Sequence, residues 1–304
     1  MKRIIFFLIT NIAILLVLSI FLSLIGFTGI LQNNGIDLDY NSLMLFSLVF
    51  GMGGSFISLY MSKWMAKKMA GVKVIQSPSN EFEKWYFNIV EKQSQRLQIK
   101  TPEIGIFESP QPNAFATGSS KNSSLVALST GLINNMNRNE VEAVIGHEMS
   151  HVANGDMVTL TLIQGIINAF VIFFSRVIGH FVDRVILKNE RGYGIGYFVT
   201  VIFAQIILAI LASVIVCWFS RRREFRADFG GAQLTSKESM ISSLKALEKF
   251  SAAKLPDQML AFGISNKGQS STLQKLFSTH PPLSKRIEAL QDIKIIPLSE
   301  QQTN

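Results

Sequence analysis

Four long stretches without a charged residue constrain the fold of this chain more than any other feature. They are Ile4–Ile36, Asn41–Ser62, Met157–Ser175 and Gly192–Ser220. A helix that crosses a bilayer needs about 20 consecutive, mostly apolar residues. The third stretch is marginal in length, and a buried core helix would also account for it. The sequence therefore predicts an α-helical membrane protein with four transmembrane helices, arranged as an N-terminal pair and a later hairpin.

The composition supports this interpretation. Of the 304 residues, 48% are hydrophobic and 16% are charged, and the mean hydropathy is +0.30. Average soluble domains carry about 25% charged residues, so the balance favours a membrane protein. The first stretch follows Lys2 and Arg3, as the core of a signal peptide would. It is much longer than a signal-peptide core of about 7–15 residues, and no A-x-A cleavage site follows it, so an uncleaved anchor is predicted.

The positive charges predict the orientation in the membrane. The net charge is +8, and many basic residues crowd the ends of the apolar stretches: Lys63, Lys67, Lys68, Lys73, Arg221, Arg222, Arg223 and Arg226. Lys and Arg beside membrane spans mark the cytoplasmic side. Both termini and the segment between the second and third spans are therefore predicted to be cytoplasmic. The loop Arg176–Arg191 is an exception, because this topology places its four basic residues outside.

Charge and cysteine content exclude other classes. No module that binds nucleic acid accompanies the basic residues, so no nucleic-acid partner is expected. Cys217 is the only cysteine. An intrachain disulfide is therefore impossible, which agrees with a soluble part in a reducing compartment.

The polar segments predict a domain that the membrane hairpin interrupts. The expected boundaries are 4–62 for the first pair of spans, 63–156 and 221–304 for the two parts of the polar domain, and 157–220 for the hairpin. Helical periodicity predicts three amphipathic or short helices: Glu81–Arg96, Ser236–Phe250 and Leu283–Gln291. Three short runs rich in β-formers predict a small antiparallel sheet: Glu103–Glu108, Ala114–Thr117 and Ser124–Ser129. Asn139 and Glu142 resemble a capping box at the start of a further helix.

That further helix contains the motif His147-Glu148-Met149-Ser150-His151. Positions i and i+4 share one helix face, so the two imidazoles can converge on one ion, with Glu148 beside them. Two nitrogen ligands, an open position and a carboxylate near the attacking water are what a zinc hydrolase requires. Chance pairing of two helical histidines is the alternative explanation, and it is unlikely for so specific a pattern.

Glu224 is the predicted third ligand. His151 lies just before the third apolar stretch, and Glu224 lies just after the fourth, so a membrane hairpin would return the carboxylate to the two histidines. Asp228 lies one helical turn after Glu224 and could accept a hydrogen bond from the distal nitrogen of a ligating histidine. Without the histidine motif, this charged segment would be interpreted as an ordinary cytoplasmic flank of a span.

Two further segments have weaker signals. Asn113, Ala114, Phe115 and Ala116 begin a short strand whose exposed edge could pair with an extended peptide. An ordinary edge strand explains the same residues. His280 precedes two prolines at the start of the last helix, where it could donate to a developing oxyanion. A surface histidine would fit that position equally well.

Taken together, these segments resemble the HtpX family of bacterial membrane-integrated zinc metalloproteases, relatives of the CAAX prenyl endoproteases. The resemblance covers nearly the whole chain and rests on the order of the spans, the histidine motif, Glu224-Phe225-Arg226-Ala227-Asp228, Asn113-Ala114-Phe115-Ala116 and Thr279-His280-Pro281. It implies a zincin-like, gluzincin-type cytoplasmic domain. It also implies one zinc ion held by His147, His151 and Glu224, with Glu148 as general base and acid. Asn113 would position the substrate backbone, and His280 would stabilise the tetrahedral intermediate.

The resemblance further implies a bacterial inner-membrane endoprotease that acts in stress response and protein quality control. Its expected partners are the lipid bilayer and unfolded or membrane-protein substrates, and the oligomeric state is left open. Two alternatives remain: a CAAX-type protease that acts on lipidated peptides, and a catalytically silent membrane scaffold or chaperone. The four apolar stretches argue against the first, because CAAX-type enzymes enclose their site with more spans. The complete ligand set argues against the second.

Overall fold

The computed structural model describes residues 39–189, 192–252 and 277–293. Within this part of the chain, three helices are long and apolar enough to cross a membrane: Tyr40–Met69, Asp156–Ile186 and Ile195–Leu234. They contain the second and third apolar stretches and all but the first three residues of the fourth. The first predicted span, Ile4–Ile36, lies outside the described residues.

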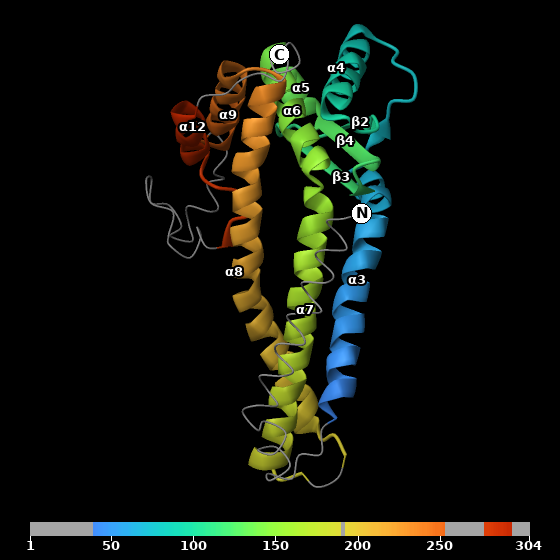
Figure 1. Ribbon diagram of the computed structural model, residues 1–304, viewed down its shortest axis with the longest axis vertical. Helices are drawn as coiled ribbons and strands as arrows, with labels where there is room; N and C mark the ends of the chain where they lie inside the picture. The colour runs from blue at the N-terminus through green and yellow to red at the C-terminus, as the bar shows by residue number, and fades with distance from the viewer. Residues whose placement is uncertain (1–38, 190–191, 253–276, 294–304) are drawn as a thin grey trace. The chain divides into compact units, whose positions relative to one another are not determined.

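The described residues form two compact units. One contains the residues up to Ile57 together with Thr161–Ile215, and the other contains Ser58–Leu160 together with the residues from Val216 onward. Helices α3 (Tyr40–Met69), α7 (Asp156–Phe181) and α8 (Ile195–Leu234) each continue from one unit into the other (Figure 1). The chain therefore leaves the second unit along one helix and returns to it along the next.

The first unit consists of apolar helices that pack through small residues. A Cβ on Gly51 of α3 would lie 2.4 Å from the backbone nitrogen of Ala169 on α7, so only glycine permits this approach. Asn168 Nδ2 donates to Ser55 Oγ at 3.5 Å beside it. Many outward side chains are apolar, and Phe203 is 66% exposed. Such exposure is expected of helices surrounded by lipid.

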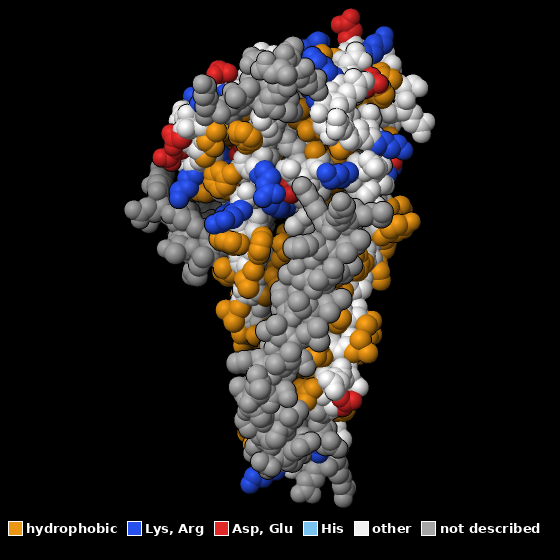
Figure 2. Space-filling view, in the orientation of Figure 1, with side chains coloured by type: hydrophobic (Ala, Val, Ile, Leu, Met, Phe, Trp, Pro, Cys, Tyr) orange, Lys and Arg blue, Asp and Glu red, His pale blue; other side chains and the backbone are white. Residues whose placement is uncertain are grey.

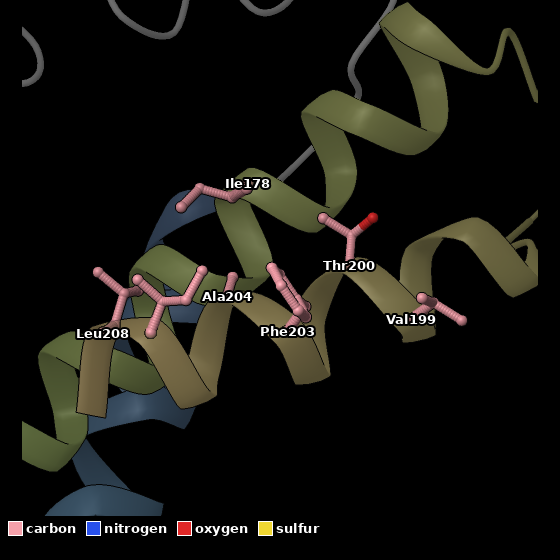
Figure 3. A pocket seen from close by; sticks show the side chains of 7 residues that line it. Ile178, Val199, Thr200, Phe203, Ala204 and Leu208 are labelled. Atoms are coloured by element: carbon pink, nitrogen blue, oxygen red, sulfur yellow. The ribbon is translucent and has the colours of Figure 1, made fainter. Parts of the chain in front are cut away.

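An apolar groove lies between α7 and α8 (Figure 3). Its lining residues carry no titratable group: Ile178, Val199, Thr200, Phe203, Ala204, Ile207 and Leu208. This groove therefore offers no groups for catalysis.

The second unit contains a four-stranded sheet with the order β1-β2-β4-β3. The strands are β1 (Lys73–Val74), β2 (Glu103–Phe107), β3 (Ala114–Ser120) and β4 (Ser123–Ser129). The predicted purely antiparallel sheet is wrong, because β2 and β4 pair in parallel. The chain after β2 crosses to the far side of β4 before it forms the antiparallel β3–β4 hairpin. Ser129 Oγ holds this crossing, since it donates to Gln111 O and accepts from Asn113 N, both at 2.8 Å.

Five helices complete the second unit within the described residues and form its core together with the sheet. They are α4 (Glu81–Leu97), α5 (Thr130–Asn135), α6 (Arg138–Asn154), α9 (Lys237–Ala252) and α12 (Leu283–Asp292). Helix α6 packs on β3, β4, α4 and α9. Apolar side chains from α4, the sheet and α6 fill the space between them, and the fully buried Tyr86 donates to Val126 O at 3.1 Å. Because α6 is buried on several sides, its position is fixed by packing.

The start of α6 differs from the prediction by two residues. Asn137, not Asn139, is the N-cap: its side chain accepts from Glu140 N at 3.1 Å, and Glu140 Oε2 accepts from Asn137 N at 3.0 Å. Both asparagines have a glutamate three positions later, so the sequence pattern alone does not choose between them. The chain is extended at Met136 after α5, which leaves Asn137 as the residue that enters the helix.

Candidate metal centre

Helix α6 presents the two histidines of the motif one turn apart. His147 is buried, and His151 has 14% of its side chain exposed. The helix ends at Gly155, whose left-handed φ of 65° lets its N–H bond back to the last turn. Helix α7 begins at the next residue. Gly155 therefore ends the motif helix directly before the third apolar stretch.

Helix α8 crosses α6 at small residues, which brings Glu224 to the histidines. A Cβ on Gly230 would lie 2.4 Å from Ser150 Oγ, and a Cβ on Gly146 would lie 3.3 Å from Gly231 Cα. A larger residue at Gly230 would push the helices apart. The close crossing thus depends on glycine in both helices.

His147, His151 and Glu224 form a cluster with the geometry of a metal site. The two histidine Nε2 atoms lie 3.2 Å apart. Glu224 Oε2 lies 3.6 Å from His147 Nε2, and Glu224 Oε1 lies 3.4 Å from His151 Nε2. Tetrahedral zinc with ligand bonds of about 2.0–2.2 Å requires ligand atoms separated by about 3.3–3.6 Å. The three side chains therefore fit a zinc ion.

Two carboxylates fix the orientation of the imidazoles. Asp228 Oδ1 lies 2.9 Å from His147 Nδ1, and Asp156 Oδ2 lies 2.7 Å from His151 Nδ1. A proton on each Nδ1 leaves both Nε2 lone pairs free for a cation. The structure places Asp228 where the sequence predicted it. Asp156 was not predicted; its only signal in the sequence was a carboxylate one residue beyond the helix-ending Gly155.

Arg286 is a second residue that sequence reasoning missed. It lies on α12 with 6% of its surface exposed, donates from Nε to Asp228 Oδ2 at 2.7 Å and from Nη2 to Asp228 Oδ1 at 2.5 Å, and places Nη1 3.4 Å from Glu224 Oε2. Burial opposes its charge, but the salt bridge with Asp228 raises the pKa of Arg286 above its ordinary value. The guanidinium therefore remains a cation that holds these two carboxylates in place.

The carboxylates make the cluster attractive to cations. Burial lowers the pKa of His151, but the hydrogen bonds with Asp156 and Glu224 and the charge of Glu148 outweigh it and raise the pKa to about 10. Burial likewise opposes protonation of His147, yet Asp228 and Glu224 raise its pKa above the ordinary value. A negative site of this kind stabilises either protons or a divalent metal ion, so metal binding would release protons.

One oxygen of Glu224 lacks an ordinary hydrogen bond. Within the described residues, Oε2 is buried and accepts no hydrogen bond of good geometry. His280 Nδ1 lies 2.8 Å away from it, although 64% of the His280 side chain is exposed. Buried carboxylate oxygens are ordinarily paired or bound to metal. Glu224 Oε2 is thus available as a ligand atom.

Glu148 and the β3 segment also lie close to the motif helix or its histidines. Glu148 is half-buried and near enough to His151 to raise its pKa. Ala114, Phe115 and Ala116 lie in β3, the last strand in the sheet order, which packs against α6. Asn113 is exposed just before this strand. The structure therefore brings an edge strand to the motif helix.

Comparison with known proteins gives concordant results. Residues 81–294 match the family model described as Peptidase family M48. A protein named Protease HtpX from Thioalkalivibrio sulfidiphilus is 58% identical over 292 residues, which cover 96% of this chain and 99% of the relative. A Protease HtpX homolog from Nitrosomonas europaea is 55% identical over 292 residues, with the same coverage. The crystal structure of S. mikatae Ste24p has a similar fold: the TM-score is 0.61 at 16% identity, over 95% of this chain and 67% of that one.

Proposed function

The chain belongs to peptidase family M48, among the HtpX proteases, and from this we propose that it is a zinc-dependent endoprotease that cleaves misfolded or damaged membrane proteins. The observation that supports this proposal most directly is the cluster of His147, His151 and Glu224. Its nitrogen and oxygen atoms have the separations of tetrahedral zinc ligands, and carboxylates hold both Nδ1 atoms.

The proposed roles follow from chemistry and position. His147, His151 and Glu224 would hold the zinc ion, which would supply a Lewis acid for the attacking water and the peptide carbonyl. The Glu148 carboxylate takes a proton as the water oxygen attacks the carbonyl carbon. The same carboxyl group then gives this proton to the amide nitrogen as the carbon–nitrogen bond breaks.

Two other groups assist in this proposal. The His280 imidazole donates a hydrogen bond to the oxygen that gains negative charge during attack. The edge of β3 that has no neighbouring strand among the described residues, with Asn113 at its start, pairs with the backbone of an extended substrate. This mode of binding recognises the main chain of the substrate more than its side chains, which suits an enzyme that acts on many unfolded polypeptides.

The cytoplasmic membrane surface is the proposed location of the site. Helix α6 leads through Gly155 directly into the apolar helix α7, and Glu224 lies on α8 just beyond its apolar part. Both halves of the cluster are therefore within a few helical turns of a candidate span. Loops that misfolded membrane proteins expose at the bilayer would meet the site there.

Replacement of Glu148 by Gln tests the proposal. This change keeps the shape of the side chain and removes the base. We expect zinc to remain at one ion per chain and cleavage of an unfolded membrane protein to fall by at least about 10²-fold, the usual contribution of general acid–base catalysis. Metal analysis and a cleavage assay with the purified full chain measure the two effects. Glu91→Gln, an exposed position on α4, is the matched control.

Three results would contradict the proposal. Proteolysis by Glu148→Gln at the control rate would remove Glu148 from the mechanism. Stoichiometric zinc in Glu224→Ala would show that another residue is the third ligand. A wild-type chain that binds zinc yet cleaves neither unfolded nor lipidated peptides, with or without a chelator, would favour the scaffold alternative.

A further inference from the structure

Helix α8 has two chemically different faces beside the metal cluster. The buried face carries Cys217, Ser220, Glu224 and Asp228 at intervals of three and four residues. Residues two positions apart on a helix lie about 200° apart around its axis. Three other residues each lie two positions before a buried one and therefore lie on the opposite face: Trp218, Arg222 and Arg226. That face is exposed.

The exposed face changes in character along the helix. Leu211 is 62% exposed and Ile215 is 51% exposed, and Trp218 follows with 44%. The Arg222 guanidinium lies 4.5 Å from the centroid of the Trp218 ring, and Arg226 comes one turn later. The order along this face is thus aliphatic, aromatic and cationic. Figure 2 shows Lys and Arg side chains gathered over the upper part of α8, next to hydrophobic ones.

The two arginines have no anionic partner among the described residues. Within the described ranges, no carboxylate lies at ion-pair distance from Arg222 or Arg226, whereas the neighbouring Arg223 is engaged with Asp156 O and Ser220 Oγ at 3.1 Å. Helix α3 shows a similar pairing, since Lys68 Nζ lies 5.1 Å above the exposed Trp64 ring. Trp at the boundary of a span marks the headgroup level of a bilayer.

Phosphate is the group that this surface fits. Guanidinium groups bind phosphate oxygens through two hydrogen bonds, and two arginines one turn apart can serve neighbouring headgroups. We propose that Trp218, Arg222 and Arg226 form a binding surface for the headgroups of anionic phospholipids. Because Glu224 lies on the opposite side of the same helix turns, this surface sets the depth of the metal cluster relative to the lipid headgroups.

Fluorescence of Trp218 tests the proposal without any assay of proteolysis. In a Trp64→Phe/Trp85→Phe background, Trp218 is the single tryptophan. The full chain is reconstituted in vesicles that contain either brominated phosphatidylglycerol or brominated phosphatidylcholine at the same mole fraction. We expect at least twofold stronger quenching by the anionic lipid, and loss of this excess at high salt, because salt screens charge attraction at an exposed surface.

Three double variants complete the experiment. Arg222→Gln/Arg226→Gln should abolish the excess quenching, and Arg222→Lys/Arg226→Lys should retain only part of it, because lysine keeps the charge but loses the two-bond contact with phosphate. Lys245→Gln/Lys249→Gln makes the same charge change at the same spacing on exposed positions of α9 and should leave the excess unchanged. Equal quenching by the two lipids, or an excess that persists in Arg222→Gln/Arg226→Gln, would overturn the proposal. So would loss of the excess in the α9 variant, because net charge alone would then explain it.

Discussion

At the scale of single residues, Asp156 links the metal cluster to two membrane helices, α7 and α8. Its carboxylate holds His151 Nδ1, and its backbone oxygen accepts from Arg223 Nη1 on α8. It is also the first residue of α7. Movement of α7 or α8 would therefore reach His151 through one side chain.

Two replacements of Asp156, by Asn and by Ala, should weaken zinc binding to different degrees. Asn keeps an acceptor for His151 Nδ1 but removes the charge, and Ala removes both. Loss of such carboxylate partners typically costs about 10–100-fold in metal affinity. We expect Asp156→Asn near the lower value and Asp156→Ala near the upper one, measured by competition with a chromophoric chelator.

Asp292→Asn, at an exposed position on α12, is the control for this series. Zinc affinity in Asp156→Ala equal to that of the control would show that the contact with His151 has no effect on the metal.

Arg286 escaped sequence reasoning because it acts through tertiary contacts. His147, His151, Glu224 and Asp228 follow a helical spacing, so sequence alone could place them on two helix faces. Arg286 lies on α12, and nothing in its local sequence indicates that it contacts Asp228. Its role depends on how α12 packs near α8, which no periodicity encodes.

At the scale of elements, the crossing of α6 and α8 determines whether the ligands meet. Glycines at 146, 230 and 231 let these helices approach closely. The α8 helix is continuous from Ile195 to Leu234, so its position at the crossing also fixes Glu224 and Asp228.

Gly230→Ala should therefore lower stability and zinc content together. The new methyl group would clash with Ser150 Oγ and Cβ, and overpacking of this kind costs about 1–3 kcal/mol. We expect a lower midpoint of thermal unfolding and less than one zinc per chain. Ser150→Gly in the same chain should restore part of both.

Gly53→Ala serves as the comparison, since no neighbouring element among the described residues has an atom within 4 Å of the added Cβ. It should retain full zinc content. Full zinc and unchanged stability in Gly230→Ala would show that the crossing tolerates a larger residue.

Element boundaries were predictable where local chemistry determines them. Glu81–Arg96 and Leu283–Gln291 differ from α4 and α12 by one residue, because capping and apolar periodicity are local signals. The parallel pairing of β2 with β4 was not predictable in the same way. It depends on the path of the crossing between β2 and β3, which Ser129 stabilises from a distant position in the sequence.

At the scale of the whole molecule, contacts within the protein partly explain why basic residues lie in and beside the hairpin loop. Asp183 is buried and accepts from Asn189 Nδ2 at 2.9 Å and from Gly194 N at 3.2 Å. Arg184 Nη1 donates to Asn189 O at 2.8 Å, and the Arg176 guanidinium lies 4.8 Å from the Phe46 ring centroid. Both arginines thus have partners within the protein, which reduces their weight as signals of orientation.

The remaining charges predict which side of the membrane each end of the hairpin faces. In a Cys217→Ser background, a cysteine at Tyr193, which is 58% exposed near the hairpin loop, should react with a membrane-impermeant maleimide in intact spheroplasts. A cysteine at the exposed Lys245 of α9 should react only after the membrane is permeabilised. The expectation rests on the exposed basic residues that flank α3 and α8, which resist transfer across the membrane. Labelling of Lys245→Cys without permeabilisation would place the metal cluster outside the cytoplasm, where its proposed substrates would be different proteins.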